Sequence, residues 1–455
     1  MSNGTHEHPR ILICTPDSIG EQMAGPAIRA LEMAKVLSAG CEVRLVSTQQ
    51  ADLTRAGITI AYADDDALRR HADWADAIVF QGHVLASHPW LSDARYVLVA
   101  DIYDPMHLEV LEQTRYLSQD DREHVSAITT EVLNTQIERA DFLICASEKQ
   151  RDFWLGQLAA LGRINPRTYD ADTSLRSLLA VAPFGIGDEP PVQSRHGIKG
   201  TVPGIGADDT VVLWGGGIYN WFDPITLIHA IDRLAPRHPD LRLFFLGVSH
   251  PNPNVPEMEV SMRTRELAAE LGLADRVVFF NEGWVPYAER ADFLLDADLG
   301  VSTHFDHLET AFSFRTRILD YLWAGLPIVA TDGDTFASII REHQLGRVVP
   351  PEDVDALADA LERSLYGDGE AERLRANVRT YADRMRWSTV LAPVAAFCRN
   401  PRRAADRGVE SVRRREQRSL EIRVEALERS TSWRITRPLR WAAGKVARRA
   451  MRRAQ

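Results

Sequence analysis

The chain has 455 residues, of which 45% are hydrophobic and 26% charged, and its formal net charge at pH 7 is −11. This length is too great for one ordinary hydrophobic core and the composition is typical of a globular protein, so two sizeable domains are expected. The first ten residues are polar and no apolar run is long enough to cross a bilayer, which excludes a membrane-spanning protein and predicts a cytosolic one.

In the first part of the chain, residues 1–185, short apolar runs alternate with helix-like segments. A strand-like run at 10–17 is followed by a glycine-containing loop and by an amphipathic helix. Further strand-like runs occur at 41–48, 57–63, 76–82, 96–104 and 141–148, with helix-like segments such as 121–140 between them. The alternation predicts a parallel sheet covered on both faces by helices.

A second unit of the same kind follows a linker. Residues 186–209 are rich in glycine and proline and lack apolar periodicity, which indicates a linker. Strand-like runs then recur at 210–217, 241–247, 276–283, 299–303 and 326–333, with helix-like segments between them. We expect a second doubly wound domain over 210–385, and a helical segment over 386–400 that returns to the first domain. Ligands of such sheets bind at the carboxyl ends of the strands.

Three glycines, Gly215, Gly216 and Gly217, follow the first strand of the second domain, and Asp223 with Pro224 has the pattern of a helix N-cap and first turn. Glycines let the backbone approach an anion closely, and the N-terminus of the next helix offers free N–H groups and the positive end of its dipole. The segment therefore predicts a diphosphate site. A tight strand-to-helix turn without a ligand explains the same residues.

The run 304–334 carries a second anion signal. Ser313 has the pattern of the N-cap of a helix whose first turn holds Arg315 and Arg317. Two guanidinium groups at a helix N-terminus are disfavoured by the macrodipole unless an anion binds there. We expect a phosphate group at this position; the alternative is an ion pair between Arg317 and Asp320, with Arg315 in solvent.

The stretch from Arg10 to about Phe397 resembles the family 4 glycosyltransferases, which are retaining enzymes of the GT-B fold. The resemblance is carried by GPAIRALEMAKVL at 25–37, WGGGIYNWFDP at 214–224 and ETAFSFRTRILDYLWAGLPIVATDGD at 309–334. The last segment is similar to members that serve cell-surface polysaccharide synthesis. The resemblance implies two Rossmann-like α/β domains facing each other across a cleft, with a nucleotide-sugar donor bound by the second domain.

The chain departs from the family in its acidic motif, which is Glu, seven residues, Glu. Placing the second acid at Asp320 puts Phe312 where the first should be, and Glu309 is the candidate substitute. By this resemblance Glu309 contacts the transferred sugar and Asp320 the ribose hydroxyls. A lone acid in or beside a helix is equally typical of a solvated residue or a salt-bridge partner.

A second departure concerns the basic residues. The family commonly has an Arg and a Lys after the first strand of the nucleotide domain, where this chain has Gly217 and Phe222. Arg315 and Arg317 are the candidates to supply that charge. In a retaining reaction the anomeric carbon becomes oxocarbenium-like while diphosphate leaves, so the enzyme mainly stabilises negative charge. We therefore assign catalytic roles to Glu309, Arg315 and Arg317.

Further donor contacts are expected around the glycine loop and beside the two arginines. The predicted donor-binding residues are Gly215, Gly216, Gly217, Ser313, Phe314 and Asp320. Trp221 and Trp284 lie near expected strand ends, where they either stack on base or sugar or belong to the core. No cofactor is expected, because the nucleotide-sugar is a co-substrate.

No metal site is expected. The acidic run at 64–66 is similar to the metal-binding carboxylates of the other major glycosyltransferase fold, but it falls at a predicted helix start, where acids act as caps. The cysteines at 14, 41, 145 and 398 have neither zinc-site nor disulfide spacing and lie mostly in apolar segments. This pattern predicts reduced core thiols.

The acceptor is expected to bind to the first domain. The predicted acceptor-side residues are Gly25, Arg29, Asp101, Asp104 and His107. The last three follow a strand within one short loop, where they could orient or deprotonate a hydroxyl. A proline-containing turn with aspartate caps is the alternative explanation of the same letters.

The C-terminal tail, residues 401–455, is electrostatically distinct. It holds 17 Lys/Arg and 6 Asp/Glu, a net charge of +11 that leaves −22 for residues 1–400. Residues 411–428 have the pattern of a charged helix with a sparse apolar stripe, which permits a short coiled coil. Residues 430–453 contain eight basic residues, no acids and two tryptophans, which is typical of an interfacial helix on anionic lipid. Nucleic acid is the competing partner, but the acidic remainder offers no second basic surface.

The sequence thus predicts a metal-independent retaining glycosyltransferase. It would move a sugar from a nucleotide-diphosphate donor to a glycan, lipid-linked by expectation because of the basic tail, in cell-surface polysaccharide synthesis at the inner face of the cell membrane. A GT-B-like scaffold or binding subunit is the alternative, because Phe312, Gly217 and Phe222 replace polar residues. A GT-B epimerase or phosphorylase is a third possibility, and no lysine-centred cofactor signature favours a phosphorylase.

Overall fold

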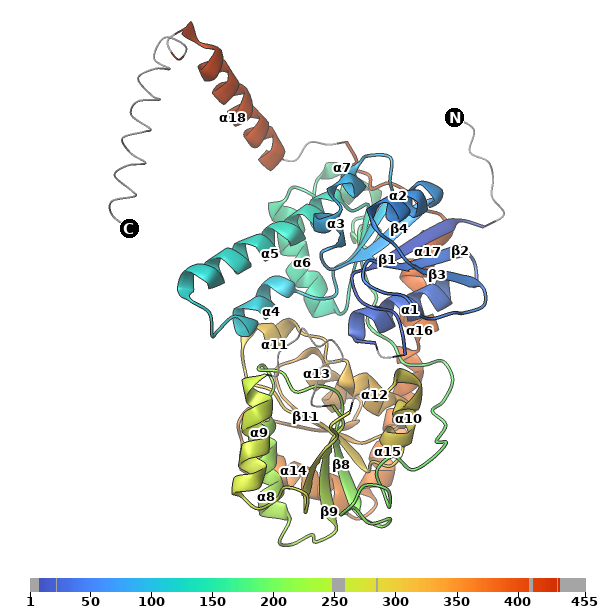
Figure 1. Ribbon diagram of the computed structural model, residues 1–455, viewed down its shortest axis with the longest axis vertical. Helices are drawn as coiled ribbons and strands as arrows, with labels where there is room; N and C mark the ends of the chain where they lie inside the picture. Colours follow the sequence, from blue (N-terminus) through green and yellow to red (C-terminus); the bar gives the residue numbers. More distant parts are fainter. Residues whose placement is uncertain are drawn as a thin grey trace.

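The computed structural model describes residues 8–21, 23–247, 258–283, 285–408, 412–431 and 433. Within them the chain forms two α/β domains that lie one above the other (Figure 1). The first contains a seven-stranded sheet of order β3-β2-β1-β4-β5-β6-β7, and the second a six-stranded sheet of order β10-β9-β8-β11-β12-β13. All described strand pairs within the sheets are parallel. The predicted fold class, two doubly wound domains, is confirmed.

The first domain follows the predicted alternation of strands and helices. Its elements are β1 (Arg10–Thr15), α1 (Gly25–Leu37), β2 (Glu42–Ser47), β3 (Ile58–Tyr62), α2 (Asp65–Trp74), β4 (Ala77–Gln81), α3 (Val84–Ser87), β5 (Leu98–Asp101), α4 (Met106–Gln113), α5 (Gln119–Arg139), β6 (Phe142–Cys145), α6 (Glu148–Ala160), α7 (Pro166–Ala171) and β7 (Leu179–Val181).

The second domain repeats the plan. Its elements are β8 (Thr210–Trp214), α8 (Pro224–Leu234), β9 (Leu241–Phe245), α9 (Glu259–Glu270), β10 (Val278–Phe280), α10 (Arg290–Leu294), β11 (Leu299–Ser302), α11 (Leu308–Phe312), α12 (Arg317–Ala324), β12 (Ile328–Thr331), α13 (Thr335–Glu342), β13 (Gly346–Val349), α14 (Val354–Tyr366) and α15 (Glu370–Ala382). The chain then forms α16 (Trp387–Val390), α17 (Ala392–Arg399) and α18 (Val412–Arg429).

Both faces of each sheet are buried, which explains why the strands read as continuous apolar runs. In β1, Ile11 and Ile13 enter one hydrophobic cluster, whereas Leu12 and Cys14 enter another on the opposite face. The first of these clusters also receives Leu213 from β8, so it runs without interruption from one domain into the other.

Two predicted helix starts are confirmed. Asp223 is the N-cap of α8 and accepts a hydrogen bond from the Thr226 backbone N–H at 3.0 Å, with Pro224 at the first helical position. Asp64 caps α2 in the same way, accepting from the Ala67 N–H at 2.8 Å. The acidic run at 64–66 therefore serves as a helix start.

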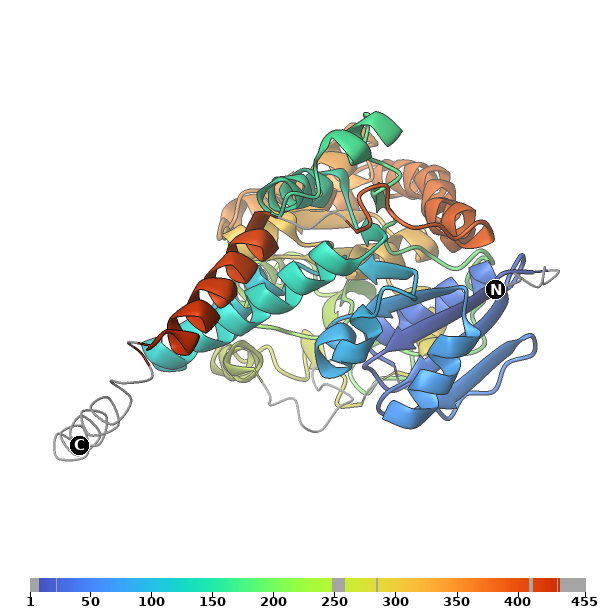
Figure 2. The same ribbon diagram turned by 90° about the horizontal axis from the view of Figure 1, so that it is seen from above.

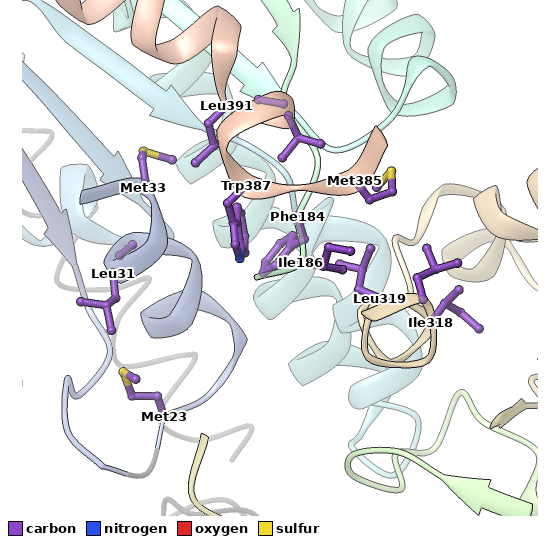
Figure 3. Packing of buried hydrophobic residues seen from close by; sticks show 14 of the residues in the cluster. Met23, Leu31, Met33, Phe184, Ile186, Ile318, Leu319, Met385, Trp387 and Leu391 are labelled. Atoms are coloured by element: carbon purple, nitrogen blue, oxygen red, sulfur yellow. The ribbon is translucent and has the colours of Figure 1, made fainter. Parts of the chain in front are cut away.

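The chain crosses between the domains twice, and the two crossings are hydrogen-bonded to each other. The Ile186 N–H donates to the Met385 carbonyl at 2.7 Å, and the Trp387 N–H donates to the Ile186 carbonyl at 3.0 Å. A Cβ on Gly185 would lie 2.8 Å from the Trp387 ring, so only glycine fits there. Figure 3 shows Phe184, Ile186 and Trp387 packed between α1 of the first domain and Leu319 on α12 of the second.

The chain after α15 returns to the first domain. In α17, the ring of Phe397 stacks on that of Phe142 with centroids 4.5 Å apart. Beyond α17, Asp406 accepts two hydrogen bonds from the buried guanidinium of Arg163, at 2.8 and 3.2 Å. The segment therefore completes the core of the first domain, and the figure draws it in orange beside the blue β1 and β2 (Figure 1).

The last described element, α18, extends away from the body of the first domain (Figures 1 and 2). It agrees with the helix predicted at 411–428. The predicted interfacial helix at 430–453 lies outside the described residues, except for positions 430, 431 and 433. Among the helices that the structure describes, none is long and apolar enough to cross a membrane.

The four cysteines are buried and free, as core thiols are. Burial raises the pKa of Cys14 and of Cys145 to about 12, so both are uncharged at neutral pH.

Candidate active site

A cavity of about 340 Å³ lies between the two domains. The first domain contributes the start of α1, including Gly25, and the crossing segment around Phe184. The second domain contributes the glycine loop after β8 and the N-terminal part of α12. The two predicted anion signals therefore lie on one cavity wall, at the carboxyl edge of the second sheet.

The glycine loop is held close to the sheet by Tyr321 of α12. The Gly215 N–H donates to the Tyr321 hydroxyl at 2.8 Å, and that hydroxyl donates to the Val301 carbonyl at 2.8 Å. A Cβ on Gly215 would lie 3.2 Å from the Tyr321 ring, and Gly216 has φ of +79°. The glycines are therefore required by the loop itself, and they leave its backbone exposed to the cavity.

Arg317, the first residue of α12, lies buried between two aromatic rings. Its guanidinium carbon is 4.2 Å from the centre of the Trp214 ring and 3.9 Å from that of Phe222. Nη2 donates to the Gly217 carbonyl at 2.7 Å, and Nη1 has no hydrogen-bond partner. Burial lowers the pKa of Arg317 to about 10, which still leaves it charged at pH 7. No described carboxylate pairs with it.

Arg315 lines the same cavity but has an acidic partner. Its Nη1 and Nη2 donate to the two carboxylate oxygens of Glu309 at 3.1 and 2.8 Å, and both side chains are buried. Glu309 is not among the residues that line the cavity, and its predicted contact with the sugar stays a prediction. The alternative of a solvated Arg315 and an Arg317–Asp320 pair is wrong.

The predicted N-cap role of Ser313 is wrong. Ser313 follows α11 in an extended conformation, and its hydroxyl donates to the Thr310 carbonyl at 3.0 Å. The helix begins later, at Arg317, and no side chain caps it. The neighbouring Phe314 does line the cavity, where its ring lies 4.8 Å from that of Phe336.

Asp320 lies at the other end of the cavity and bonds with Arg290 of α10, Nε to Oδ1, at 3.2 Å. The Arg290 guanidinium lies 3.7 Å from the Tyr287 ring centre and 4.2 Å from that of Trp323. Burial raises the pKa of Asp320, and the charge of Arg290 opposes that shift. Asp320 was predicted as a donor-binding residue, whereas Tyr287, Arg290 and Trp323 were not, because they come from separate segments without a shared motif.

Phe312, which stands where the family has an acid, makes a contact between the domains. Its ring lies 4.7 Å from that of Phe153 on α6, and the Lys149 ammonium lies 5.7 Å from its centre. Gln150 Nε2 donates to the carbonyls of both Phe312 and Tyr103 at 2.8 Å. The substitution thus places α6 of the first domain against α11 of the second.

Two of the predicted acceptor-side residues form a buried ion pair. Arg29 Nε and Nη2 donate to the Asp101 carboxylate at 2.6 and 2.9 Å, and Nη2 also donates to the Ala182 carbonyl. Both side chains are fully buried. They hold α1 to the ends of the strands, and their predicted contact with an acceptor stays a prediction.

The other acceptor-side candidates differ in their surroundings. The His107 ring packs on Phe153 and Trp154, with centroids 5.4 and 5.6 Å away, and burial lowers its pKa to about 4. It is neutral at pH 7 and packed against aromatic rings, and its predicted acceptor-side role stays a prediction. Asp104 faces the second domain: burial and the charge of Glu309 raise its pKa to about 6, against a hydrogen bond with Glu109.

Of the two tryptophans considered for stacking, Trp221 lines the cavity and stacks on Tyr219 with ring centroids 4.9 Å apart. Trp284 lies outside the described residues. The cavity is thus lined by aromatic rings, open glycine backbone and two buried guanidinium groups, an arrangement that can bind a compact anion next to a flat ring.

Comparisons with known proteins agree with this geometry. Residues 209–386 match the family model described as glycosyl transferases group 1. Over 172 residues the chain is 28% identical to the phosphatidyl-myo-inositol mannosyltransferase of Mycolicibacterium smegmatis, covering 37% of this chain and 39% of that protein. Over 318 residues it is 25% identical to the D-inositol 3-phosphate glycosyltransferase of Stackebrandtia nassauensis, covering 67% and 65%. The chain spans between 31% and 42% of the first curated relatives it matches.

Solved structures show the same fold. A sucrose-phosphate synthase from Thermosynechococcus elongatus superposes with a TM-score of 0.62 and 17% identity, over 86% of this chain and 98% of that one. HepE of Anabaena, in complex with UDP-glucose, superposes with a TM-score of 0.57 and 14% identity, over 86% and 99%. The two domains therefore have the GT-B arrangement.

Proposed function

We propose that this chain, whose residues 209–386 belong to the glycosyl transferases group 1 family, transfers a sugar from a nucleotide-diphosphate donor to a hydroxyl acceptor with retention at the anomeric carbon. The observation that carries the proposal is Arg317: a buried guanidinium that lines the cavity between the domains, beside the glycine loop, with one N–H group free and no described carboxylate partner.

A buried cation without an acidic partner is unfavourable in an empty protein, because its desolvation is offset only by the two aromatic faces and one carbonyl. A diphosphate would supply the missing negative charge and accept the free N–H of Arg317. The backbone of Gly215, Gly216 and Gly217 offers the close approach that an anion of this kind needs. Arg317 is therefore best explained as one wall of a diphosphate site.

The chemistry follows from where charge develops. As the glycosidic bond to phosphate breaks, negative charge grows on the leaving diphosphate, and Arg317 and Arg315 stabilise it without reorganising. Glu309 acts on Arg315, which it holds by two hydrogen bonds. The two guanidinium groups can supply the positive charge that a divalent cation supplies in other enzymes, so the proposed reaction needs no metal.

The nucleoside is assigned to the aromatic end of the cavity. Tyr287, Arg290 and Trp323 form a flat, stacked wall there, and Asp320 is the candidate partner of the ribose hydroxyls. The HepE structure, of the same fold, contains UDP-glucose. Support for a lipid-linked acceptor in envelope glycan synthesis comes from the basic tail and from the relatives named for phosphatidyl-myo-inositol. This role places the protein at the inner face of the cell membrane.

The alternative of a scaffold subunit is favoured by Phe312, which makes a domain contact in place of an acid. The two functions are separated by titrating purified protein with UDP and GDP in EDTA and then measuring hydrolysis of a panel of UDP- and GDP-sugars. We expect metal-independent binding of a nucleoside diphosphate and slow donor hydrolysis. Binding without any turnover would support the scaffold, and loss of both in EDTA would contradict the proposed chemistry.

A further inference from the structure

The helices α4 and α5, with the loop between them, carry an exposed apolar surface. Among the described residues of 8–408, eight large apolar side chains are exposed, and three of them belong to this hairpin. These three are Leu111, Tyr116 and Ile128, with exposed fractions of 39%, 75% and 49%. Exposed apolar side chains that gather in one region mark a site of interaction. Residues 111–131 are called the α4–α5 surface below.

The α4–α5 surface is also acidic. Residues 111–131 contain five Asp and Glu, two Arg and no Lys. One of the arginines, Arg115, pairs with Glu112 at 2.7 Å. The acids at the start of α5 are exposed to solvent, and they are Asp120, Asp121 and Glu123. The surface therefore presents apolar side chains beside an excess of negative charge.

This combination narrows the class of occupant. An anionic lipid surface would repel the acids of α5. A symmetric contact with a second copy would bring the same acids against each other. An amphipathic basic segment, in contrast, offers an apolar side together with the opposite charge.

The chain itself contains such a segment. Residues 434–455, which lie outside the described residues, include eight basic residues and no acids. Their larger apolar residues include Leu439, Trp441 and Val446. The tail and the α4–α5 surface are therefore complementary in charge and similar in apolar character.

The tail is also long enough to reach this surface. A helix of 18 residues such as α18 is about 27 Å long. The 22 residues after Trp433 span about 33 Å as a helix and about 70 Å when extended. Both α18 and α5 extend toward the same side of the molecule, at the left in Figures 1 and 2. The tail can therefore turn back from the end of α18 toward the α4–α5 surface.

We propose that residues 434–455 bind the α4–α5 surface of the same chain in solution, and that an anionic membrane competes for them. The two contacts exclude each other, because the same basic and apolar side chains of the tail serve both. The protein thus withholds its membrane anchor until it meets anionic lipid. The docking is independent of the proposed transfer reaction, whereas the competition rests on the proposed membrane binding of the tail.

Zero-length carbodiimide crosslinking of the full-length protein tests the docking, because this reagent joins a lysine to a carboxylate that it contacts. Lys445 is the single lysine of residues 401–455. Mass spectrometry of the monomeric product should find Lys445 joined to Asp120, Asp121 or Glu123, with a yield that falls at high salt. Lys445→Arg keeps the charge and should abolish the product.

A pair of surface substitutions tests the apolar part of the contact without removing any carboxylate. Tyr116→Ser with Ile128→Ser should lower the yield about fivefold or more. Tyr62→Ser with Met262→Ser is the matched control, because these side chains are 54% and 47% exposed elsewhere on the molecule, and the yield should not change. Thermal melting checks the fold of both variants. If the first variant does not fold, the position of the crosslink in the unaltered protein decides the matter.

Vesicles test the competition. Phosphatidylglycerol mixed with phosphatidylcholine should lower the yield about fivefold or more, and phosphatidylcholine alone should leave it unchanged. Lys445 joined only to acids outside residues 111–131, or joined between two copies, would overturn the docking. A crosslink that persists in protein floating with the anionic vesicles would overturn the competition. The expected crosslink in a protein that never floats would support the docking and refute the membrane role of the tail.

Discussion

Replacing Arg317 by methionine tests the anion site most sharply, because methionine keeps an unbranched apolar stem between Trp214 and Phe222 and removes only the charge and the donors. In the empty protein two effects oppose each other. Burial lowers the pKa of Arg317 from its usual value to about 10, which corresponds to a penalty of about 3 kcal/mol on the charged form. Two cation–π contacts and the bond to Gly217 return about 2–3 kcal/mol. The melting temperature of Arg317→Met should therefore differ little from that of the unaltered protein.

With donor bound, the balance changes. The charge-assisted contact to diphosphate is lost, and removal of one such donor typically costs about 2.7–4 kcal/mol, or about 10²–10³-fold in kcat. Arg317→Lys keeps the charge but lacks the planar fork, so its kcat should lie between those of the unaltered protein and Arg317→Met.

The assays are thermal melting, calorimetric titration with UDP and GDP, and single-turnover donor hydrolysis. Arg290→Met serves as the matched control at the other end of the cavity, where we expect weaker nucleotide binding with a smaller effect on the chemical step. Arg317 is a structural residue, and the reasoning fails, if Arg317→Met lowers the free energy of unfolding by several kcal/mol. The same holds if the variant leaves nucleotide affinity and turnover unchanged.

Three further predictions follow from other groups. Arg315→Met removes the guanidinium partner of the buried Glu309 and should lower the free energy of unfolding by about 3 kcal/mol. Adding Glu309→Leu should restore most of that free energy without restoring turnover, and denaturant titration of both variants decides this. The pKa of Asp104 is about 6 in the folded protein and 3.8 without the fold, so the folded state holds the extra proton between these values and stability should fall as pH rises from about 4 to 6. Asp104→Asn should therefore be more stable than the unaltered protein at pH 7.5, by up to about 3 kcal/mol, and equally stable at pH 4; equal melting temperatures at both values would contradict the assignment. Deleting residues 430–455 should abolish salt-sensitive flotation with anionic vesicles and spare activity on a soluble acceptor, and a truncated protein that still floats would exclude the tail as the anchor.

The fold could be predicted from the sequence because its signals are local. Strands buried on both faces give short continuous apolar runs, and caps such as Asp64 and Asp223 are set by residues within one turn. Ser313 shows the limit of the same reasoning: its sequence context suits a cap, but Ser313 is extended and follows α11, and α12 begins only at Arg317 without a side-chain cap.

The site was predictable only in part. The cavity wall formed by the glycine loop and Arg317 was expected, because the glycine loop follows a strand and Arg317 lies at the start of a helix. The partners of charged groups were not, since Arg29 pairs with Asp101 across 72 residues and Arg290 with Asp320 across 30. Sequence periodicity and spacing do not predict such long-range ion pairs. The pairs determine which charged side chains remain available to a ligand.

The return of the C-terminal segment makes the first domain discontinuous in sequence. The Phe397 ring covers the Phe142 ring, and Asp406 pairs with the buried Arg163. Residues 1–185 alone would therefore expose an apolar face and leave the Arg163 guanidinium without Asp406. During synthesis the second domain has left the ribosome before the first can close its core. A chain cut after α15 therefore leaves the earlier-made domain unfinished, and expression of the isolated first domain requires residues 386–408 to be supplied with it.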